Sequence, residues 1–282
     1  MTEKPAENKT TAAAKTTRWD SLRQVFVPSF GNFRVWLLQL FGSTVIILAT
    51  AGFLRTGETF FQLTLGSLLV LVAVVAWMAL DGGTFNYYLD QQRNQTSLLK
   101  SPFMRALKHA LPLLIVAAIF FLLRLWLERL DDYHYSFPGY LRSELPAWLR
   151  RHISETNIQN LYDLFLFFLR WIVLPVLLLP VASLCADKGF RGFIAFRIWV
   201  RMFLNRLFWG LVIVASILGV VIPVALTGWK LDPRTASLAE EKSFLAFRIA
   251  IGTVLVLSAW LMVSFTLAHT RMKAETATPS KT

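Results

Sequence analysis

Two arginines inside long apolar runs are the side chains of this sequence whose chemistry is easiest to define. Arg124 lies in the run 110–127 and Arg170 in the run 164–186, and neither run holds another charge. An arginine at the centre of a membrane helix costs about 2.5–3.5 kcal/mol on insertion scales, so each needs a compensating partner. We weigh two positions for Arg170. It either reaches the outer lipid headgroups, or it faces the helix bundle and pairs with Glu128, with Arg124 in the same network.

Two aspartates, Asp81 and Asp187, stand where apolar runs end, and a glycine follows each within two residues. The motifs of known membrane enzymes do not accompany them: there is no Gly-Lys-Ser/Thr phosphate loop, no His-Glu-x-x-His and no Gly-x-Ser-x-Gly. Asp131, Asp132 and His134 are close enough in sequence for a metal site, but a closed site needs about four preorganised ligands. We therefore expect no catalytic residue, no cofactor and no metal.

The elements that must position these charges are six apolar helices. The chain has 282 residues, of which 55% are hydrophobic and only 16% charged, and its mean hydropathy is +0.52. A membrane-spanning helix needs about 20 apolar residues, and no alternating strand pattern points to a barrel. The sequence therefore predicts an all-α polytopic membrane helix bundle. The predicted spans are 35–54, 63–80, 110–127, 164–186, 207–229 and 249–270, with Pro175, Pro180 and Pro223 interrupting the fourth and fifth.

The distribution of basic residues predicts the orientation of these spans. The segments up to residue 34, 81–110, 185–206 and after residue 270 hold eighteen lysines and arginines, whereas the alternate segments 55–62, 128–160 and 227–244 hold eight. The positive-inside rule then places both termini in the cytoplasm of a bacterial inner membrane. We expect polar, disordered tails at 1–17 and 271–282, with the membrane domain over 18–270.

The net charge of +12 is explained by this topology. It predicts attraction to anionic lipid headgroups rather than to nucleic acid, because the apolar runs leave no soluble basic face. The one cysteine, Cys185, cannot form an intrachain disulfide, and we expect it to act as a small apolar residue. A short surface helix is expected at 146–153 in the longest outer loop.

Basic, aromatic-rich amphipathic stretches precede the first, third and fifth spans, at 19–26, 101–108 and 193–203. Their spacing is typical of helices that lie in the headgroup plane. Asp81-Gly82-Gly83 also matches Asp187-Lys188-Gly189. Two explanations stay open: a threefold repeat of an interfacial helix followed by a transmembrane hairpin, or independent anchoring of each cytoplasmic loop.

The segment Ala79-Leu80-Asp81-Gly82-Gly83-Thr84-Phe85, with Gln92–Leu98 and Phe103–Leu107 after it, resembles a known kind of domain. It is similar to the multi-helix membrane domains found beside some bacterial glycerophosphodiester phosphodiesterases, and to related bacterial membrane proteins. The resemblance covers about a third of the chain. It implies no enzymatic activity, because the catalytic barrel takes about 250 residues outside the membrane.

These observations favour a non-catalytic integral membrane protein that organises or partners other membrane proteins, in contact with membrane lipids. The alternative is a transporter for an anionic or amphipathic solute, with Arg124 and Arg170 as the binding charges. An intramembrane lipid-modifying enzyme is the least supported, since acid–base pairs are missing. Polar residues at mid-membrane are scarce in the first, second and sixth spans, which argues for the first reading over transport.

Overall fold

The computed structural model describes residues 30–57, 59–95, 99–229 and 238–276, which are helical almost throughout and contain no strand. Six of its helical segments are long and apolar enough to cross a membrane, which confirms the predicted fold class. They form three hairpins. Hairpin one consists of α2 (Phe33–Phe53) and α3 (Phe60–Gln92). Hairpin two consists of α5 (Ala110–Glu128), which pairs with the successive helices α8 (Glu155–Phe168) and α9 (Leu174–Lys188). Hairpin three consists of the successive helices α12 (Arg206–Ser216) and α13 (Ile222–Gly228), which pair with α14 (Leu238–Thr276).

Shorter helices connect these hairpins and close the outer end of hairpin two. The amphipathic stretch at 101–108 forms α4 (Lys100–Lys108), and the stretch at 193–203 forms two helices that break at Ala195. The stretch at 19–26 and the tail 1–17 lie outside the described residues. The remaining elements are η1 (Arg129–Tyr133), α6 (Ser136–Glu144), the single-turn α7 (Ala147–Arg150), η2 (Leu169–Val173), α10 (Arg191–Ile194), α11 (Phe196–Phe203) and η3 (Ile217–Val221).

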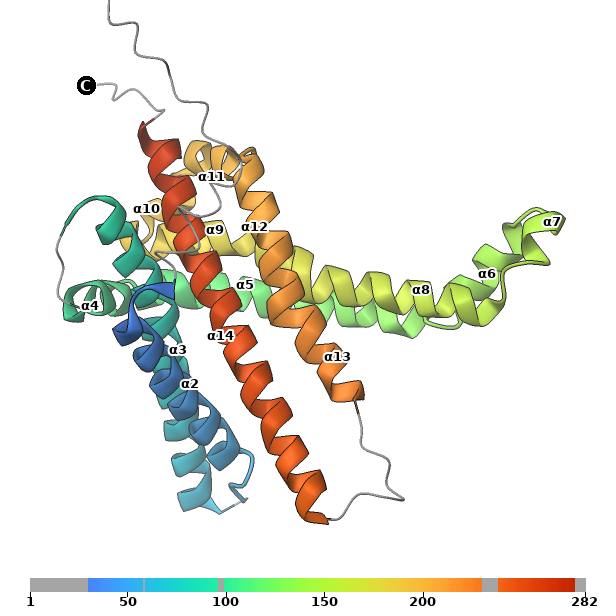
Figure 1. Ribbon diagram of the computed structural model, residues 1–282, viewed down its shortest axis with the longest axis horizontal. Helices are drawn as coiled ribbons and strands as arrows, with labels where there is room; N and C mark the ends of the chain where they lie inside the picture. Colours follow the sequence, from blue (N-terminus) through green and yellow to red (C-terminus); the bar gives the residue numbers. More distant parts are fainter. Residues whose placement is uncertain (1–29, 58, 96–98, 230–237, 277–282) are drawn as a thin grey trace, which may run out of the picture.

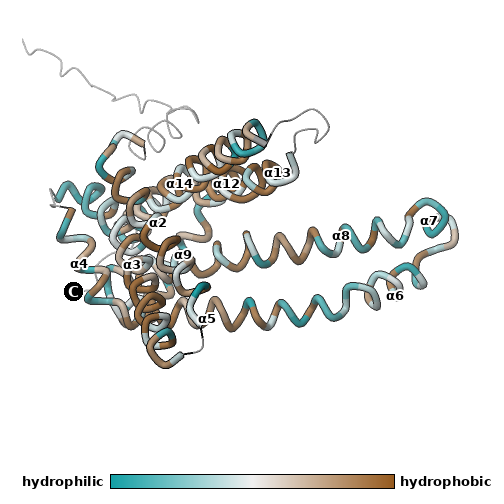
Figure 2. The backbone as a smooth tube through the Cα atoms, turned by 90° about the horizontal axis from the view of Figure 1, so that it is seen from below, coloured by the Kyte–Doolittle hydropathy of each residue, from teal (hydrophilic) through white to brown (hydrophobic). Residues whose placement is uncertain are grey.

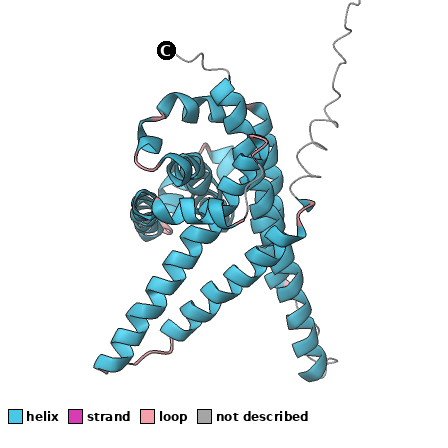
Figure 3. Cartoon of the chain, turned by 90° about the vertical axis from the view of Figure 1, so that its left-hand side faces the viewer, coloured by secondary structure: helices cyan, strands magenta, loops and turns pink. Residues whose placement is uncertain are grey.

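The three hairpins diverge from one end of the molecule, which we call the junction (Figure 1). Hairpin two runs at a wide angle to the other two, and its outer end with α6 and α7 extends far from them. The long helices also spread apart away from the chain end marked C in Figure 3. Hydrophobic residues follow the long helices, whereas α4, α6 and α7 are largely hydrophilic (Figure 2). The arrangement therefore concentrates the contacts between hairpins at the junction.

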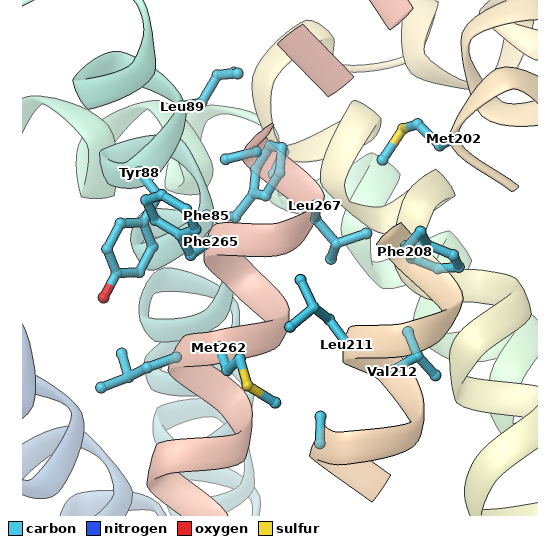
Figure 4. Close-up of a cluster of buried hydrophobic side chains, with 14 of the residues drawn as sticks. Phe85, Tyr88, Leu89, Met202, Phe208, Leu211, Val212, Met262, Phe265 and Leu267 are labelled. Carbon is cyan, nitrogen blue, oxygen red and sulfur yellow. The ribbon is translucent and has the colours of Figure 1, made fainter. Parts of the chain in front are cut away.

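A buried hydrophobic cluster holds α3, α12 and α14 together near the junction (Figure 4). Tyr88 of α3 packs edge-on against Phe265 of α14, with 5.5 Å between ring centroids. Such an aromatic pair contributes about 0.5–1.5 kcal/mol beyond its buried area. Phe208 and Leu211 of α12 are also buried and lie on the other side of α14 from Tyr88 (Figure 4). Hairpins one and three are therefore joined by apolar packing as well as by charge.

Two of the three prolines expected to interrupt spans do so. The helix widens into a π-helical turn just before Pro175, at η2, and again just before Pro223, at η3. Proline has no backbone N–H, and its ring collides with the carbonyl four residues earlier, so a wider turn relieves the clash. Each proline then occupies the first turn of the helix that follows, where proline is well tolerated. Pro180 lies inside α9 without ending it.

Two helix ends differ from the predictions. The second span was expected to end at residue 80, but α3 continues through Gly82 and Gly83 to Gln92. A Cβ atom on Gly83 would lie 2.3 Å from Cδ1 of Phe103, so the bare backbone is what lets α4 pack on α3. The tail expected at 271–282 was wrong for 271–276, because α14 runs to Thr276 and its last turns are buried at the junction.

Candidate functional site: a charged cluster beside an apolar cavity

Seven charged side chains from all three hairpins meet at the junction, and we call them the junction cluster. Its four cations and three carboxylates come from α3, α4, α9 and α14. They are Asp90, Arg93, Arg105, Asp187, Lys188, Arg271 and Glu275.

Arg105 and Arg271 are the two cations that approach Asp187 most closely. Arg105 contacts both carboxylate oxygens of Asp90, at 3.0 and 3.1 Å, and Oδ1 of Asp187 at 3.2 Å. Arg271 is fully buried, pairs with Oδ2 of Asp187, and donates from Nε to Glu275 at 3.1 Å. Asp187 therefore sits between the two guanidinium groups and links α4 to α14.

The outer part of the cluster is formed by Glu275 and two more cations. Arg93 approaches Glu275 at 3.1 Å and Asp187 at 3.6 Å, and Lys188 approaches Glu275 at 2.8 Å. Burial alone would lower the pKa of Arg105, but the hydrogen bond to Asp90 and the charges of both aspartates raise it. All seven groups thus satisfy one another, and the cluster connects the hairpins rather than holding a group free for reaction.

Backbone groups beside the cluster are also bound by side chains. Nδ2 of Asn86 donates to the carbonyls of Pro102 at 3.3 Å and Ala186 at 3.0 Å, which ties α3 to α4 and α9. Nδ1 of His109 lies 3.1 Å from the same Ala186 carbonyl. Gly189, with φ +62°, ends α9 directly against His109, where another residue would be strained.

An apolar cavity of about 370 Å³ lies next to the cluster, on the side toward the outer ends of the hairpins. Residues of α3, α5, α9 and α14 form its wall, so it is bounded by all three hairpins. The polar side chains in the wall are Asp81, Ser183 and Ser264, with the indoles of Trp77 and Trp260. Asp81 accepts a hydrogen bond from Trp77, and Ser183 donates to the Pro180 carbonyl at 2.7 Å.

The charges predicted in hairpin two form local pairs, but not the predicted network. Arg124 contacts Glu128 on the next turn at 3.3 Å and lies 4.6 Å from the centre of the Trp171 ring. Arg170 pairs with Asp131 at 2.8 Å and donates to the Leu127 carbonyl at 2.7 Å. Of the two positions weighed for Arg170, the pairing with Glu128 is therefore wrong, although Arg124 does contact Glu128 as that alternative expected.

Helix geometry explains this partner of Arg170. Glu128 is four residues after Arg124, so the two side chains share a helix face. The tighter turn η1 follows α5 directly and carries Asp131, which ends up on the side that faces Arg170. Arg170 is only 15% exposed, and its guanidinium reaches η1 at the end of α5. That it reaches the outer lipid headgroups stays a prediction.

The loop residues considered for a metal do not gather. Asp131 is occupied by Arg170, and Nδ1 of His134 lies 2.7 Å from Asp163. Across the described part of the chain, no three His, Cys, Asp or Glu side chains come close enough to hold a metal ion.

Asp81 and Asp187, matched in the proposed repeat, occupy different surroundings. Asp187 belongs to the junction cluster, whereas Asp81 faces the cavity; Asp90 is the aspartate of hairpin one that shares Arg105 with Asp187. The structure therefore does not support the register of the repeat, although an amphipathic helix does precede hairpins two and three. The sequence analysis did not single out the other six members of the cluster. The spacing of Arg271 and Glu275, one turn apart beyond the last apolar run, was the available signal.

Comparison with known proteins adds no relative: no family model, curated protein or solved structure matches this chain. The resemblance to membrane domains beside glycerophosphodiester phosphodiesterases stays a prediction. What can be argued about function therefore depends on the geometry.

Proposed function

We propose that this integral membrane protein is a non-catalytic component of the bacterial inner membrane that organises another membrane protein. In this proposal both termini and the junction face the cytoplasm, in contact with anionic headgroups. The excess of basic residues in the segments that meet at the junction supports this orientation. The four cations of the junction cluster belong to those same segments.

The observation that carries the proposal is an apolar stripe on α8. Leu161, Leu164 and Phe165 are 65%, 62% and 54% exposed, and their spacing places them on one face of the helix. At 1.5 Å per residue they lie about 33–39 Å along the helix from Asp187, whereas the hydrocarbon core is about 30 Å thick. The stripe therefore lies at the end of hairpin two that is far from the junction (Figure 1).

The described residues of the chain leave this stripe uncovered. We infer that an apolar helix of another membrane protein packs against it, since a stripe at this spacing fits the groove of a second helix. Hairpin two needs no further partner for its charges, because Arg124 and Arg170 each have a carboxylate within the hairpin. The same pairing weakens the alternative of a transporter that uses these arginines to bind an anionic solute.

The test is photo-crosslinking in living cells. A photoreactive phenylalanine analogue replaces Leu164 on the stripe, and a matched variant carries it at Leu122. That residue is similarly exposed, at 66%, but lies on α5, nearer the junction than the stripe. We expect the probe at position 164 to form an adduct with another protein, and the probe at position 122 to react with lipid.

Adducts at twice the mass of the chain would identify the partner as a second copy and would contradict an organising role toward a different protein. Lipid adducts alone at both positions would refute the proposal. The paired change Leu164→Ser and Phe165→Ser, probed from Leu161, should abolish the protein adduct while the membrane yield is kept.

A further inference from the structure

The apolar cavity contains a carboxylate that the rest of the fold leaves without a cation. Asp81 lies nine residues before Asp90 on α3, about 13 Å along the helix axis from the junction cluster. Trp77 donates a hydrogen bond to it, and among the described residues no lysine, arginine or histidine belongs to the cavity wall. A charged carboxylate in such surroundings is costly unless a cation or proton accompanies it.

Two further polar groups beside the cavity also lack partners. Oγ of Ser264 and Nε1 of Trp260 are buried and form no hydrogen bond within the described residues. Both side chains belong to the cavity wall and come from α14, whereas Asp81 comes from α3. Buried polar groups in native proteins are nearly always hydrogen-bonded, so unpartnered ones beside a cavity point to an occupant.

The size and lining of the cavity define the occupant further. Its volume lies within the range of small-molecule sites, about 300–1,000 Å³. The wall is otherwise apolar and aromatic, with Phe85 and Leu267 among the residues visible in Figure 4. Trp77 is 41% exposed at the side of the cavity, so the site is not sealed from the surroundings of the helices.

We propose that this cavity binds an amphipathic amine, a molecule with one ammonium group on an apolar body, and that Asp81 is the partner of the ammonium group. Trp77 and Trp260 add indole rings to the wall, and ammonium groups are attracted to indole rings. An anionic ligand is disfavoured because the wall has a carboxylate and no basic side chain. The inference does not depend on the proposed organising role.

Two kinds of molecule carry an ammonium group on an apolar body. A free lipophilic amine carries only the ammonium group, whereas an aminophospholipid carries a phosphate beside it. The cavity wall has no basic residue for that phosphate, so the free amine is the better match.

The experiment measures equilibrium binding of radiolabelled dodecylamine to the full chain in nanodiscs of an uncharged glycolipid, which has no ammonium group, with empty nanodiscs subtracted. Unlabelled dodecanol and dodecanoate serve as competitors of equal chain length. We expect dodecylamine to bind at least about tenfold more tightly than dodecanol, and dodecanoate not to compete. Equal affinity for the amine and the alcohol would overturn the proposal without any variant being needed.

Variants then test the position of the site. Asp81→Asn keeps the shape of the side chain and should weaken dodecylamine binding about tenfold or more. Ala182→Phe places a ring in the cavity wall and should abolish binding. Asp132→Asn removes an exposed carboxylate elsewhere and should change nothing. Unchanged binding to Asp81→Asn, or an equal loss in Asp132→Asn, would refute the assignment.

A last experiment distinguishes a free lipophilic amine from an aminophospholipid as the ligand. Nanodiscs made with phosphatidylethanolamine offer an aminophospholipid at high concentration. Loss of dodecylamine binding there would show that the lipid's ammonium group occupies the same site, and unaltered binding would identify the free amine as the ligand. Either result keeps Asp81 as the partner of an ammonium group.

Discussion

Replacing Asp187 by asparagine should be among the most destabilising single changes in this protein. The side chain is 9% exposed and is approached by three guanidinium groups, those of Arg105, Arg93 and Arg271. After the change, four cations share two carboxylates, and the fully buried Arg271 keeps only Glu275 as an ionic partner.

The expected magnitude follows from the burial of these partners. Removing one member of a buried ion pair costs about 3–5 kcal/mol, because a buried charge is left without compensation. Arg93 and Arg105 are about a quarter exposed, so solvent screens the charge that each leaves unpaired. Most of the loss in the free energy of unfolding therefore comes from Arg271. For a chain of this size the loss corresponds to a fall in Tm of about 6–15 °C.

The assay is thermal unfolding of the purified protein in one mild detergent. Asp132→Asn is the matched control, because Asp132 is exposed at the far end of hairpin two, and its effect should stay within about 0.5 kcal/mol. A double-mutant cycle adds Arg271→Gln, and the double variant should lose about 1–3 kcal/mol less than the sum of the single losses. If the losses simply add, or Asp187→Asn behaves like the control, the cluster does not join the hairpins.

Three more predictions concern separate parts of the chain. A topology reporter fused after the last residue should be active only in its cytoplasmic format, and one inserted near Ser143 only in its periplasmic format; the reverse pattern would overturn the orientation. Asp131→Asn leaves the guanidinium of Arg170, which is only 15% exposed, without its ionic partner, so Asp131→Asn combined with Arg170→Leu should unfold at a higher temperature than Asp131→Asn alone, and an unchanged or lower Tm would refute the pairing. Gly83→Ala forces α4 away from α3 and should cost about 1–3 kcal/mol, and the further change Phe103→Ala should recover part of that loss; no recovery would show that the close approach is not the cause.

The existence of the six spans was determined by the sequence itself. An uncharged run of about 20 apolar residues has few stable alternatives to a membrane helix, because only helices and closed barrels satisfy the backbone in lipid. The choice of Asp81 and Asp187 as notable charges also came from the sequence, since a carboxylate at the end of an apolar run is conspicuous whatever its partners.

The partners of these charges were decided only by the tertiary structure. Asp187 meets Arg105 and Arg271, which are 82 and 84 residues away along the chain. Which face of each helix turns toward the others depends on rotation about its axis. Helices that are apolar all round carry little periodicity to specify that rotation. The sequence analysis therefore located two of the charges and could not identify the network around Asp187.

Contacts with distant segments also explain why the ends of α3 and α14 differ from the predicted ends. Gly82 and Gly83 after an apolar run are typical of a turn, and the polar residues after position 270 are typical of a tail. In the folded chain Phe103 packs on the bare backbone of Gly83, and Arg271 and Glu275 find partners from hairpins one and two. Local composition describes how a segment behaves alone in water. Contacts with distant segments change which structure is most stable. A glycine backbone can then pack against another helix, and a charged side chain can be buried beside an opposite charge.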